Sequence, residues 1–214
     1  MDKETHLAHI RDLLSQAHNP LIFFDNDPDG LSSYLLLKKF NTSCSGIVTE
    51  GHNLGEKYLR YMEEYYPDLV FILDCAVVSQ EFLDCLKVPC IWIDHHSITS
   101  RKGVNYFNPR IYNEKDSRPT TYWAYQITQQ NSWIGFIGCI SDWYYPDFYD
   151  ALDDEIKELL GTKKIAPEVL FDTSFGELCK IYFFSLKGTL RVIKENIKLL
   201  EKIKHPFEIL HQTT

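Results

Sequence analysis

Short apolar runs alternate with segments of helical periodicity through the first half of the chain. Four or five consecutive apolar residues predict a strand that is buried on both faces of a parallel sheet. Apolar side chains that recur every three or four positions predict helices. The expected strands are residues 21–24, 45–49, 69–73, 89–93 and 104–107, and the helices among them are 4–17, 31–41, 54–65 and 79–86.

Helical patterns dominate after Pro119, with expected helices at 120–130, 133–143, 151–160, 173–184 and 187–204. The alternation followed by helices predicts an α/β fold, in which a parallel sheet of about five strands is covered by helices on both faces and is followed by a helical lobe. A polar segment near 161–167 indicates a boundary. We expect an α/β domain at residues 1–160 and a helical C-terminal extension at 161–214, packed on the same domain.

Potential metal ligands follow three of these apolar runs directly. They are Asp25, Asp27 and Asp29 after the first run, Asp74 after the third, and Asp94, His95 and His96 after the fourth. The carboxyl ends of parallel strands lie on one edge of a sheet, so these groups converge if the strands are neighbours. Clustered carboxylates repel one another, and a divalent cation offsets that repulsion. The alternative for the first group is an acidic turn that caps the next helix.

A further candidate, Asp142, ends the apolar, glycine-containing helix predicted at 133–143. Negative charge is disfavoured at a helix C-terminus, so a nearby cation would explain it; a solvated aspartate is the alternative. Carboxylates with imidazoles suit Mn²⁺, Mg²⁺ or Zn²⁺. The number of candidates favours two ions that share a carboxylate, an arrangement that serves phosphoester hydrolysis.

Taken in order, four segments of the chain resemble the motifs of the DHH phosphoesterase superfamily. They are Asp25-Asn26-Asp27-Pro28-Asp29-Gly30, the single Asp74, Asp94-His95-His96, and Gly138 to Asp142. The resemblance covers roughly residues 20–145. Other branches of the superfamily more often have a histidine at the position of Phe23. This difference, together with the first motif and the segment Ser141-Asp142-Trp143, favours the RecJ-like branch, which includes archaeal RecJ-type exonucleases.

The resemblance implies a role for each residue that matches a motif. The metal ligands would be Asp25, Asp27, Asp29, Asp74, His95 and Asp142. Asp74 would bridge two divalent ions, with Mn²⁺ favoured over Mg²⁺, and a metal-bound hydroxide would be the nucleophile. His96 would hold the scissile phosphate, and Asp94 would orient an imidazole from outside the ligand set. Catalysis would thus depend on Asp74, His95, His96 and Asp142.

Weaker signals concern contacts with substrate. Thr120 and Thr121 begin a predicted helix near the site, although an ordinary helix N-cap is the favoured explanation. A basic stripe on the last predicted helix, which contains Lys187, Arg191 and Lys194, could contact phosphates or be a solvated face. His52, in the turn after the second strand, is better explained as a surface residue than as a ligand.

The charge, the cysteines and the apolar stretches of the chain limit the partners and the compartment that we expect. The formal net charge of −8 disfavours binding of nucleic acid by bulk electrostatics, although several of the acids cluster where metal would neutralise them. None of the six cysteines forms a Cys-x-x-Cys pair, so reduced thiols are expected. Without a signal-peptide pattern or an apolar stretch of about 18 residues, we expect a cytoplasmic protein and no membrane partner.

The expected function is therefore RecJ-like exonuclease hydrolysis of single-stranded DNA or RNA. One alternative is a phosphodiesterase for short oligonucleotides or (cyclic) dinucleotides, or a nucleotide phosphatase. A second is a non-catalytic scaffold subunit of a replication complex, and a replication or repair protein is a conceivable partner. The chain ends at Thr214 without the second domain usual in the superfamily, so we expect a minimal form or a catalytic fragment. The sequence does not indicate an oligomeric state.

Overall fold

The computed structural model describes residues 1–51 and 53–211. Its main sheet has five strands in the order β2-β1-β4-β6-β7, and every neighbouring pair is parallel. The strands are β1 (Pro20–Phe24), β2 (Ser45–Val48), β4 (Leu69–Leu73), β6 (Cys90–Ile93) and β7 (Asn105–Phe107). This arrangement confirms the parallel α/β sheet predicted from the apolar runs.

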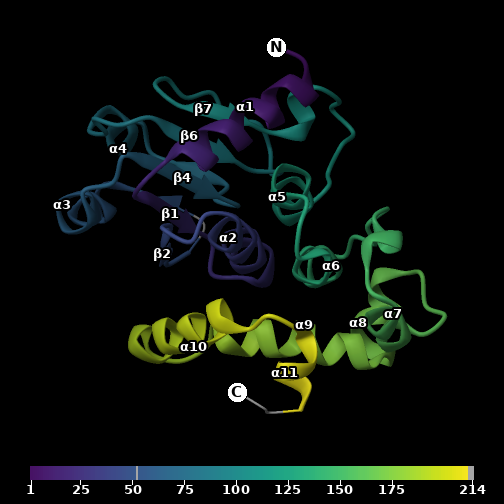
Figure 1. The fold of residues 1–214 in the computed structure, drawn as a ribbon. Coiled ribbons are helices and arrows are strands. Elements are labelled where there is room, and N and C mark those ends of the chain that lie inside the picture. Colours follow the sequence, from purple (N-terminus) through teal and green to yellow (C-terminus); the bar gives the residue numbers. More distant parts are fainter. Residues whose placement is uncertain (52, 212–214) are drawn as a thin grey trace.

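Helices cover both faces of the sheet (Figure 1). Alternate side chains of β1 point to opposite faces, so Ile22 and Phe24 join one apolar cluster while Leu21 and Phe23 join another. The first cluster is covered by α1 (Lys3–Gln16), α2 (Pro28–Phe40) and α5 (Thr120–Thr128). The second is covered by the short helices η1 (Glu56–Tyr58), α3 (Arg60–Tyr65) and α4 (Gln80–Asp84).

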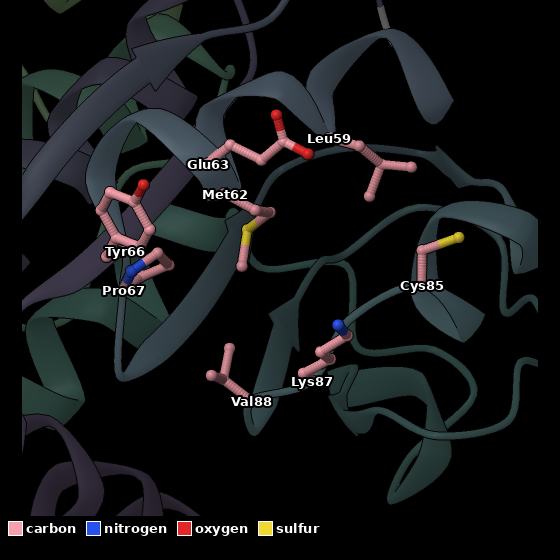
Figure 2. Close-up of a pocket in the computed structure, with 8 residues that line it drawn as sticks. All are labelled: Leu59, Met62, Glu63, Tyr66, Pro67, Cys85, Lys87 and Val88. Carbon is pink, nitrogen blue, oxygen red and sulfur yellow. The ribbon is translucent and has the colours of Figure 1, made fainter.

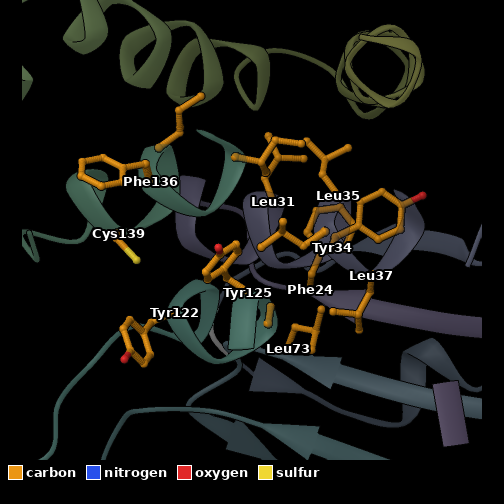
Figure 3. Close-up of a cluster of buried hydrophobic side chains, with 14 of the residues drawn as sticks. Phe24, Leu31, Tyr34, Leu35, Leu37, Leu73, Tyr122, Tyr125, Phe136 and Cys139 are labelled. Carbon is orange, nitrogen blue, oxygen red and sulfur yellow. The ribbon is translucent and has the colours of Figure 1, made fainter. Parts of the chain in front are cut away.

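A second layer of helices packs on the outer side of α2. It begins with α6 (Ser132–Ser141), and the remaining helices are α7 (Asp154–Leu160), α8 (Ala166–Asp172), α9 (Ser174–Ser185), α10 (Leu190–Lys202) and α11 (Pro206–Leu210). In Figure 3, Phe136 of α6 and Leu31 and Tyr34 of α2 lie between the strands of the sheet and the later helices of this layer. The Tyr34 hydroxyl donates a 2.6 Å hydrogen bond to Glu201 of α10. One apolar cluster thus extends from the sheet to α10, while the division of the chain at residue 160 stays a prediction.

Two predicted segments differ from the structure. The helix expected at 54–65 is interrupted, because Asn53–Leu54 (β3) pairs with Val77–Val78 (β5) in a separate two-stranded sheet. Strands of two residues are too short for an alternating pattern to reveal them. Helix α8 was not predicted, since Pro167 was interpreted as part of a boundary. Pro167 lies in the first turn of α8, where backbone N–H groups have no partner within the helix, so the missing N–H of proline costs no hydrogen bond.

The described part of the chain contains no helix that is both long and apolar enough to cross a bilayer. All six cysteines are free thiols, and Cys85 is the exposed one.

Candidate metal centre

Each strand of the main sheet is followed by a buried polar residue, and these residues form one row across the carboxyl edge. In sheet order they are Thr49, Asp25, Asp74, Asp94 and Asn108. Backbone hydrogen bonds continue the ladder into this row, from Asp25 N to the Leu73 oxygen (3.2 Å) and from Asp74 N to the Ile93 oxygen (3.0 Å). The row crosses the point between β1 and β4 where the strand order reverses, which is where open α/β sheets bind ligands. Thr49 and Asn108 were not singled out from the sequence, although each is the first polar residue after a strand.

The first acidic segment both caps a helix and contributes to the cluster of acids. Asp27 is the N-cap of α2, and its Oδ1 accepts a 2.9 Å hydrogen bond from Gly30 N. A carboxylate oxygen of Asp27 also lies within 4.8 Å of oxygens of Asp25 and Asp74. Gly30 is required for the tight turn, because a Cβ atom there would lie 2.5 Å from the Asp25 carbonyl oxygen. The two interpretations of this segment are therefore compatible.

The start of α5 holds two of the acids. Asp29 accepts hydrogen bonds from the backbone N–H groups of Thr120 (2.9 Å) and Thr121 (2.7 Å) at the positive end of the helix dipole. The Thr120 hydroxyl donates to Asp74 Oδ1 (3.0 Å), and the Thr121 hydroxyl donates to the Asp29 carbonyl oxygen (2.8 Å). Both hydroxyls thus have partners in the protein, and a direct contact of either threonine with substrate stays a prediction.

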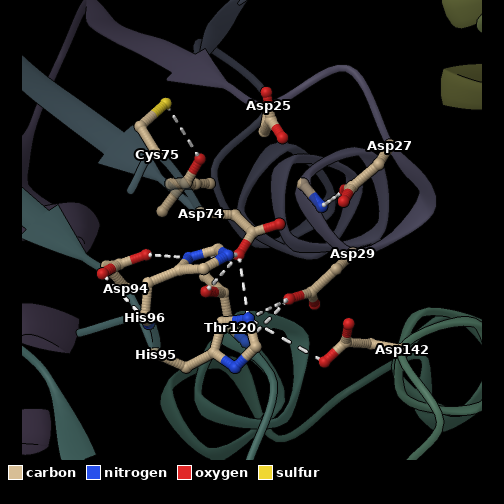
Figure 4. A network of polar contacts seen from close by, with 12 residues as sticks. Asp25, Asp27, Asp29, Asp74, Cys75, Asp94, His95, His96, Thr120 and Asp142 are labelled. Carbon is tan, nitrogen blue, oxygen red and sulfur yellow. Dashed lines mark hydrogen bonds and ion pairs between the residues drawn. The ribbon is translucent and has the colours of Figure 1, made fainter. Parts of the chain in front are cut away.

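His95 lies at the centre of the cluster (Figure 4). Its Nε2 is 3.4 Å from Asp74 Oδ1 and 3.8 Å from a carboxylate oxygen of both Asp29 and Asp142. Its Nδ1 is 3.4 Å from the Ser117 carbonyl oxygen, which can only accept a hydrogen bond. A proton on Nδ1 leaves the Nε2 lone pair directed at the carboxylates, and this is the tautomer that a metal ligand requires.

Asp94 orients the second imidazole. Its Oδ1 accepts a 2.7 Å hydrogen bond from His96 Nδ1, and its Oδ2 accepts one from His96 N (3.1 Å). The hydrogen bond to this buried carboxylate raises the pKa of His96. Asn108 supports the arrangement by donating to the His96 carbonyl oxygen (3.0 Å). The sequence had left open which imidazole Asp94 orients, and in the structure it is His96.

Asp142 reaches the cluster because α6 crosses α2 and α5 at very short distance. It is the C-cap residue of α6, one turn after Gly138. A Cβ atom on Gly138 would lie 2.3 Å from Thr121 Oγ1 and 2.8 Å from Ser32 Cβ. Only a glycine therefore allows this helix to approach closely enough to place Asp142 opposite His95.

The carboxylates are electrostatically unfavourable without a counter-charge. Burial, together with the charge of Asp29, raises the pKa of Asp74 well above its ordinary value. Burial raises the pKa of Asp29 to about 7, and the charge of Asp27 contributes to this shift. Burial likewise raises the pKa of Asp142 to about 7, and the charge of Asp29 contributes. Asp74 Oδ2 is also buried and has no hydrogen-bond partner among the described residues. A bound cation would satisfy this oxygen and offset the repulsion.

Three overlapping groups of side chains have ligand atoms within 4.8 Å of one another. The groups are Asp25, Asp27 and Asp74; Asp29, His95 and Asp142; and Asp74, His95 and His96. They include all six residues predicted as ligands and add His96, which was predicted to hold phosphate. Carboxylate oxygens with one or two imidazoles form a donor set that fits Mn²⁺ or Mg²⁺.

Addition of Mn²⁺ is expected to stabilise the protein more at pH 8 than at pH 5.5. Raised aspartate pKa values favour the folded state at low pH, and this contribution is lost as the pH rises through about 7. Cation binding compensates where the carboxylates are ionised, whereas protons compete with it at pH 5.5. At about 100 times its Kd, Mn²⁺ should raise Tm by roughly 5–10 °C at pH 8. Thermal melts with Mn²⁺ and with EDTA measure this, and equal shifts at both pH values would contradict it.

The other predicted positions lie apart from this cluster or outside the described residues. Arg191 forms an exposed ion pair with Glu195, while Lys187 lies over the Phe183 ring and Lys194 over the Tyr61 ring. None of these partners belongs to the cluster, so a contact of the basic stripe with substrate stays a prediction. His52 lies outside the described residues.

A cavity of about 500 Å³ lies at the opposite, amino edge of the sheet. Its lining comes from α3 and from the segments that lead into β4 and β6, and it includes Met62 and Cys85 (Figure 2). No residue of the acidic cluster lines it. This hollow is therefore distinct from the candidate metal centre.

Solved structures share this fold at low sequence identity. RecJ from Thermus thermophilus in complex with Mn²⁺ aligns with 92% of this chain at 15% identity and a TM-score of 0.56. An exonuclease RecJ bound to manganese aligns with 92% at 14% identity and 0.57, and the DHH domain of a member of the s1p family of ribosomal proteins with 92% at 14% and 0.56. The aligned parts are 37%, 65% and 58% of those chains, so this chain spans less than two thirds of each.

No match is found among curated proteins. The model of the DHH family, N-terminal domain, matches residues 19–143, which is more than half of the chain. The matched segment runs from the first strand to the residue after Asp142 and so contains the whole acidic cluster. This protein belongs to the DHH family.

Proposed function

We propose that this protein is a phosphodiesterase that uses two divalent cations to hydrolyse single-stranded nucleic acid from an end. The observation that carries the proposal is the convergence of two ligand groups on Asp74. Asp74 lies close to Asp25 and Asp27 on one side and to His95 on the other, which supports the proposal that two cations, when bound, would share its carboxylate. Membership of the DHH family and the acidic cluster support the class of metal-dependent phosphoesterases.

The protein groups around the proposed ions have separable tasks. Asp25, Asp27 and Asp74 would hold one cation, and Asp29, His95 and Asp142 would hold the other, with Asp74 shared. When bound, the cations would supply positive charge that stabilises the phosphate in the transition state. We propose Mn²⁺ ahead of Mg²⁺, because two of the similar structures contain manganese.

His96 is suited to contact the phosphate itself. Asp94 fixes its Nδ1 at 2.7 Å and raises its pKa, and the side chain is 39% exposed. The protonated imidazole can therefore donate a hydrogen bond from Nε2 to a non-bridging phosphate oxygen. Its position beside His95 would bring that oxygen next to the proposed cations.

A panel of substrates tests this proposal. We expect the full chain with Mn²⁺ to hydrolyse a single-stranded oligonucleotide in preference to a duplex and to a dinucleotide, and to lose this activity with EDTA. Preference for the dinucleotide would instead indicate a phosphodiesterase for short oligonucleotides. Absence of hydrolysis with Mn²⁺, Mg²⁺ and Zn²⁺ would contradict the enzymatic proposal and favour a scaffold role.

A further inference from the structure

Trp143, the residue after Asp142, occupies an unusual position at the end of α6. The helix ends in a Schellman motif, with hydrogen bonds from Trp143 N to the Ile140 oxygen (3.2 Å) and from Tyr144 N to the Cys139 oxygen (2.9 Å). In this motif the residue after the C-cap adopts left-handed backbone geometry and is usually glycine. Here Trp143 takes that place with φ of 63°. For a bulky side chain this backbone conformation is strained.

Burial does not compensate for this strain. The Trp143 side chain is 61% exposed, whereas Trp92, Trp123 and Trp133 are buried. Its nearest aromatic partner is Phe171 of α8, at a centroid distance of 6.2 Å and an interplanar angle of 50°, and Phe171 is itself 63% exposed. Two large aromatic rings from separate helices thus lie together at the surface. Consecutive Cα atoms are about 3.8 Å apart, so Trp143 begins directly beside the metal centre.

We propose that Trp143 and Phe171 form a stacking surface for a nucleobase of the substrate. This inference rests on the proposed function, because a phosphate held at the proposed metal centre would carry its attached nucleoside among the residues that surround Asp142. Aromatic side chains stack on any base, whereas the phosphate itself gains nothing from an apolar ring. A strained and exposed tryptophan next to a metal ligand is accounted for if its ring contacts substrate. The pair would therefore favour nucleotide substrates over phosphodiesters without bases.

The decisive variant is Trp143→Gly, because it separates stability from binding. Glycine adopts the left-handed conformation without strain, so Tm should stay the same or rise by about 2–4 °C. Loss of the ring should raise KM for a single-stranded oligothymidylate about 10-fold, within the range for base–aromatic stacking, with little change in kcat. The same change should leave KM unaltered for a strand in which abasic sites replace the nucleosides nearest the cleaved bond.

A fluorescence titration gives a readout that does not depend on catalysis. Trp143 is the exposed tryptophan of the four, so thymidine 5′-monophosphate with Mg²⁺ should quench the emission and protect it from acrylamide. Deoxyribose 5-phosphate, which lacks the base, should do neither. Phe171→Ala should weaken the response, and Phe184→Ala, which removes an equally exposed ring from α9, should not.

The outcomes distinguish this inference from the proposed function. If Trp143→Gly binds thymidine 5′-monophosphate and the oligonucleotide as tightly as the unaltered chain, the stacking surface is ruled out even though hydrolysis persists. A large loss of stability in Trp143→Gly would mean that the ring serves packing, and normal binding by Phe171→Ala would then overturn the proposal. Base-dependent quenching without any hydrolysis would retain the stacking surface and reject the phosphodiesterase.

Discussion

Replacement of Asp74 by asparagine is expected to lower phosphodiester hydrolysis by about three orders of magnitude. Asp74 groups with Asp25 and Asp27, and its Oδ1 lies 3.4 Å from His95 Nε2, so loss of its charge should affect both proposed cation sites. Asparagine retains an oxygen that can accept the hydrogen bond from Thr120. It also tolerates the left-handed backbone at this position, where φ is 60°. The loss should therefore be chemical rather than structural, and steady-state rates with Mn²⁺ measure it.

The same variant should be more stable than the unaltered protein when metal is absent. Burial and the charge of Asp29 raise the pKa of Asp74 in the folded state above the unfolded value near 4. The unaltered protein therefore loses stability as the pH rises from about 4, whereas the neutral amide does not contribute to this loss. Urea denaturation with EDTA at pH 8 should show the gain, and it should shrink toward pH 4.

Asp154→Asn provides a control for both measurements, because that carboxylate is almost fully exposed and distant in sequence from the motifs. It should change neither rate nor stability appreciably. Residual hydrolysis above about a tenth in Asp74→Asn would rule out a bridging role for Asp74.

Substitution of Gly138 by alanine is expected to destabilise the fold by about 1–3 kcal/mol and to weaken Mn²⁺ binding. The added methyl group would lie 2.3 Å from Thr121 Oγ1, so α6 must move away from α5 and α2. Because α6 carries Asp142 and the start of α5 holds Asp29, this movement opens the distance between two carboxylates of one ligand group. Urea denaturation and calorimetric titration with Mn²⁺ measure the two effects.

Gly135→Ala, one turn earlier on the same helix, is the matched control. Its added methyl group would lie 3.2 Å from Tyr125 Cβ and 3.3 Å from the Phe148 ring, a milder contact. The better helix propensity of alanine, about 1 kcal/mol, offsets that contact. If both variants bind Mn²⁺ equally well, the close crossing at Gly138 does not position Asp142.

The sequence predicted most accurately the strands in which a run of buried apolar residues ends directly at a charged residue. Residues 69–73 are apolar throughout and end at a carboxylate, and the strand has the predicted limits. The parallel register could not be read from these runs. Backbone pairing between strands that are distant in sequence determines this register. The register aligns Asp25, Asp74 and Asp94 along one edge of the sheet and places Thr49 and Asn108 in the same row.

Other parts of the site depend on contacts that leave no periodic signal. The hydrogen bonds from the start of α5 to Asp29 join residues 91 and 92 positions apart, so the sequence could suggest a helix start or a substrate contact for Thr120 and Thr121 but not their contact with Asp29. Trp143 was noted only as part of the Ser141-Asp142-Trp143 segment and was given no role, because its backbone angle and its exposure cannot be read from the sequence.

The close crossing of α6 has a consequence for the order of events during folding. The proposed ligands span residues 25–142, and the last of them arrives only when α6 docks on α2 and α5. A nascent chain that has formed β1, β4 and β6 alone would offer an incomplete ligand set and would bind divalent ions weakly. Such long-range contacts form late, after loop closure has been overcome. If the proposed cations bind, their complete ligand set would therefore form only together with the native topology.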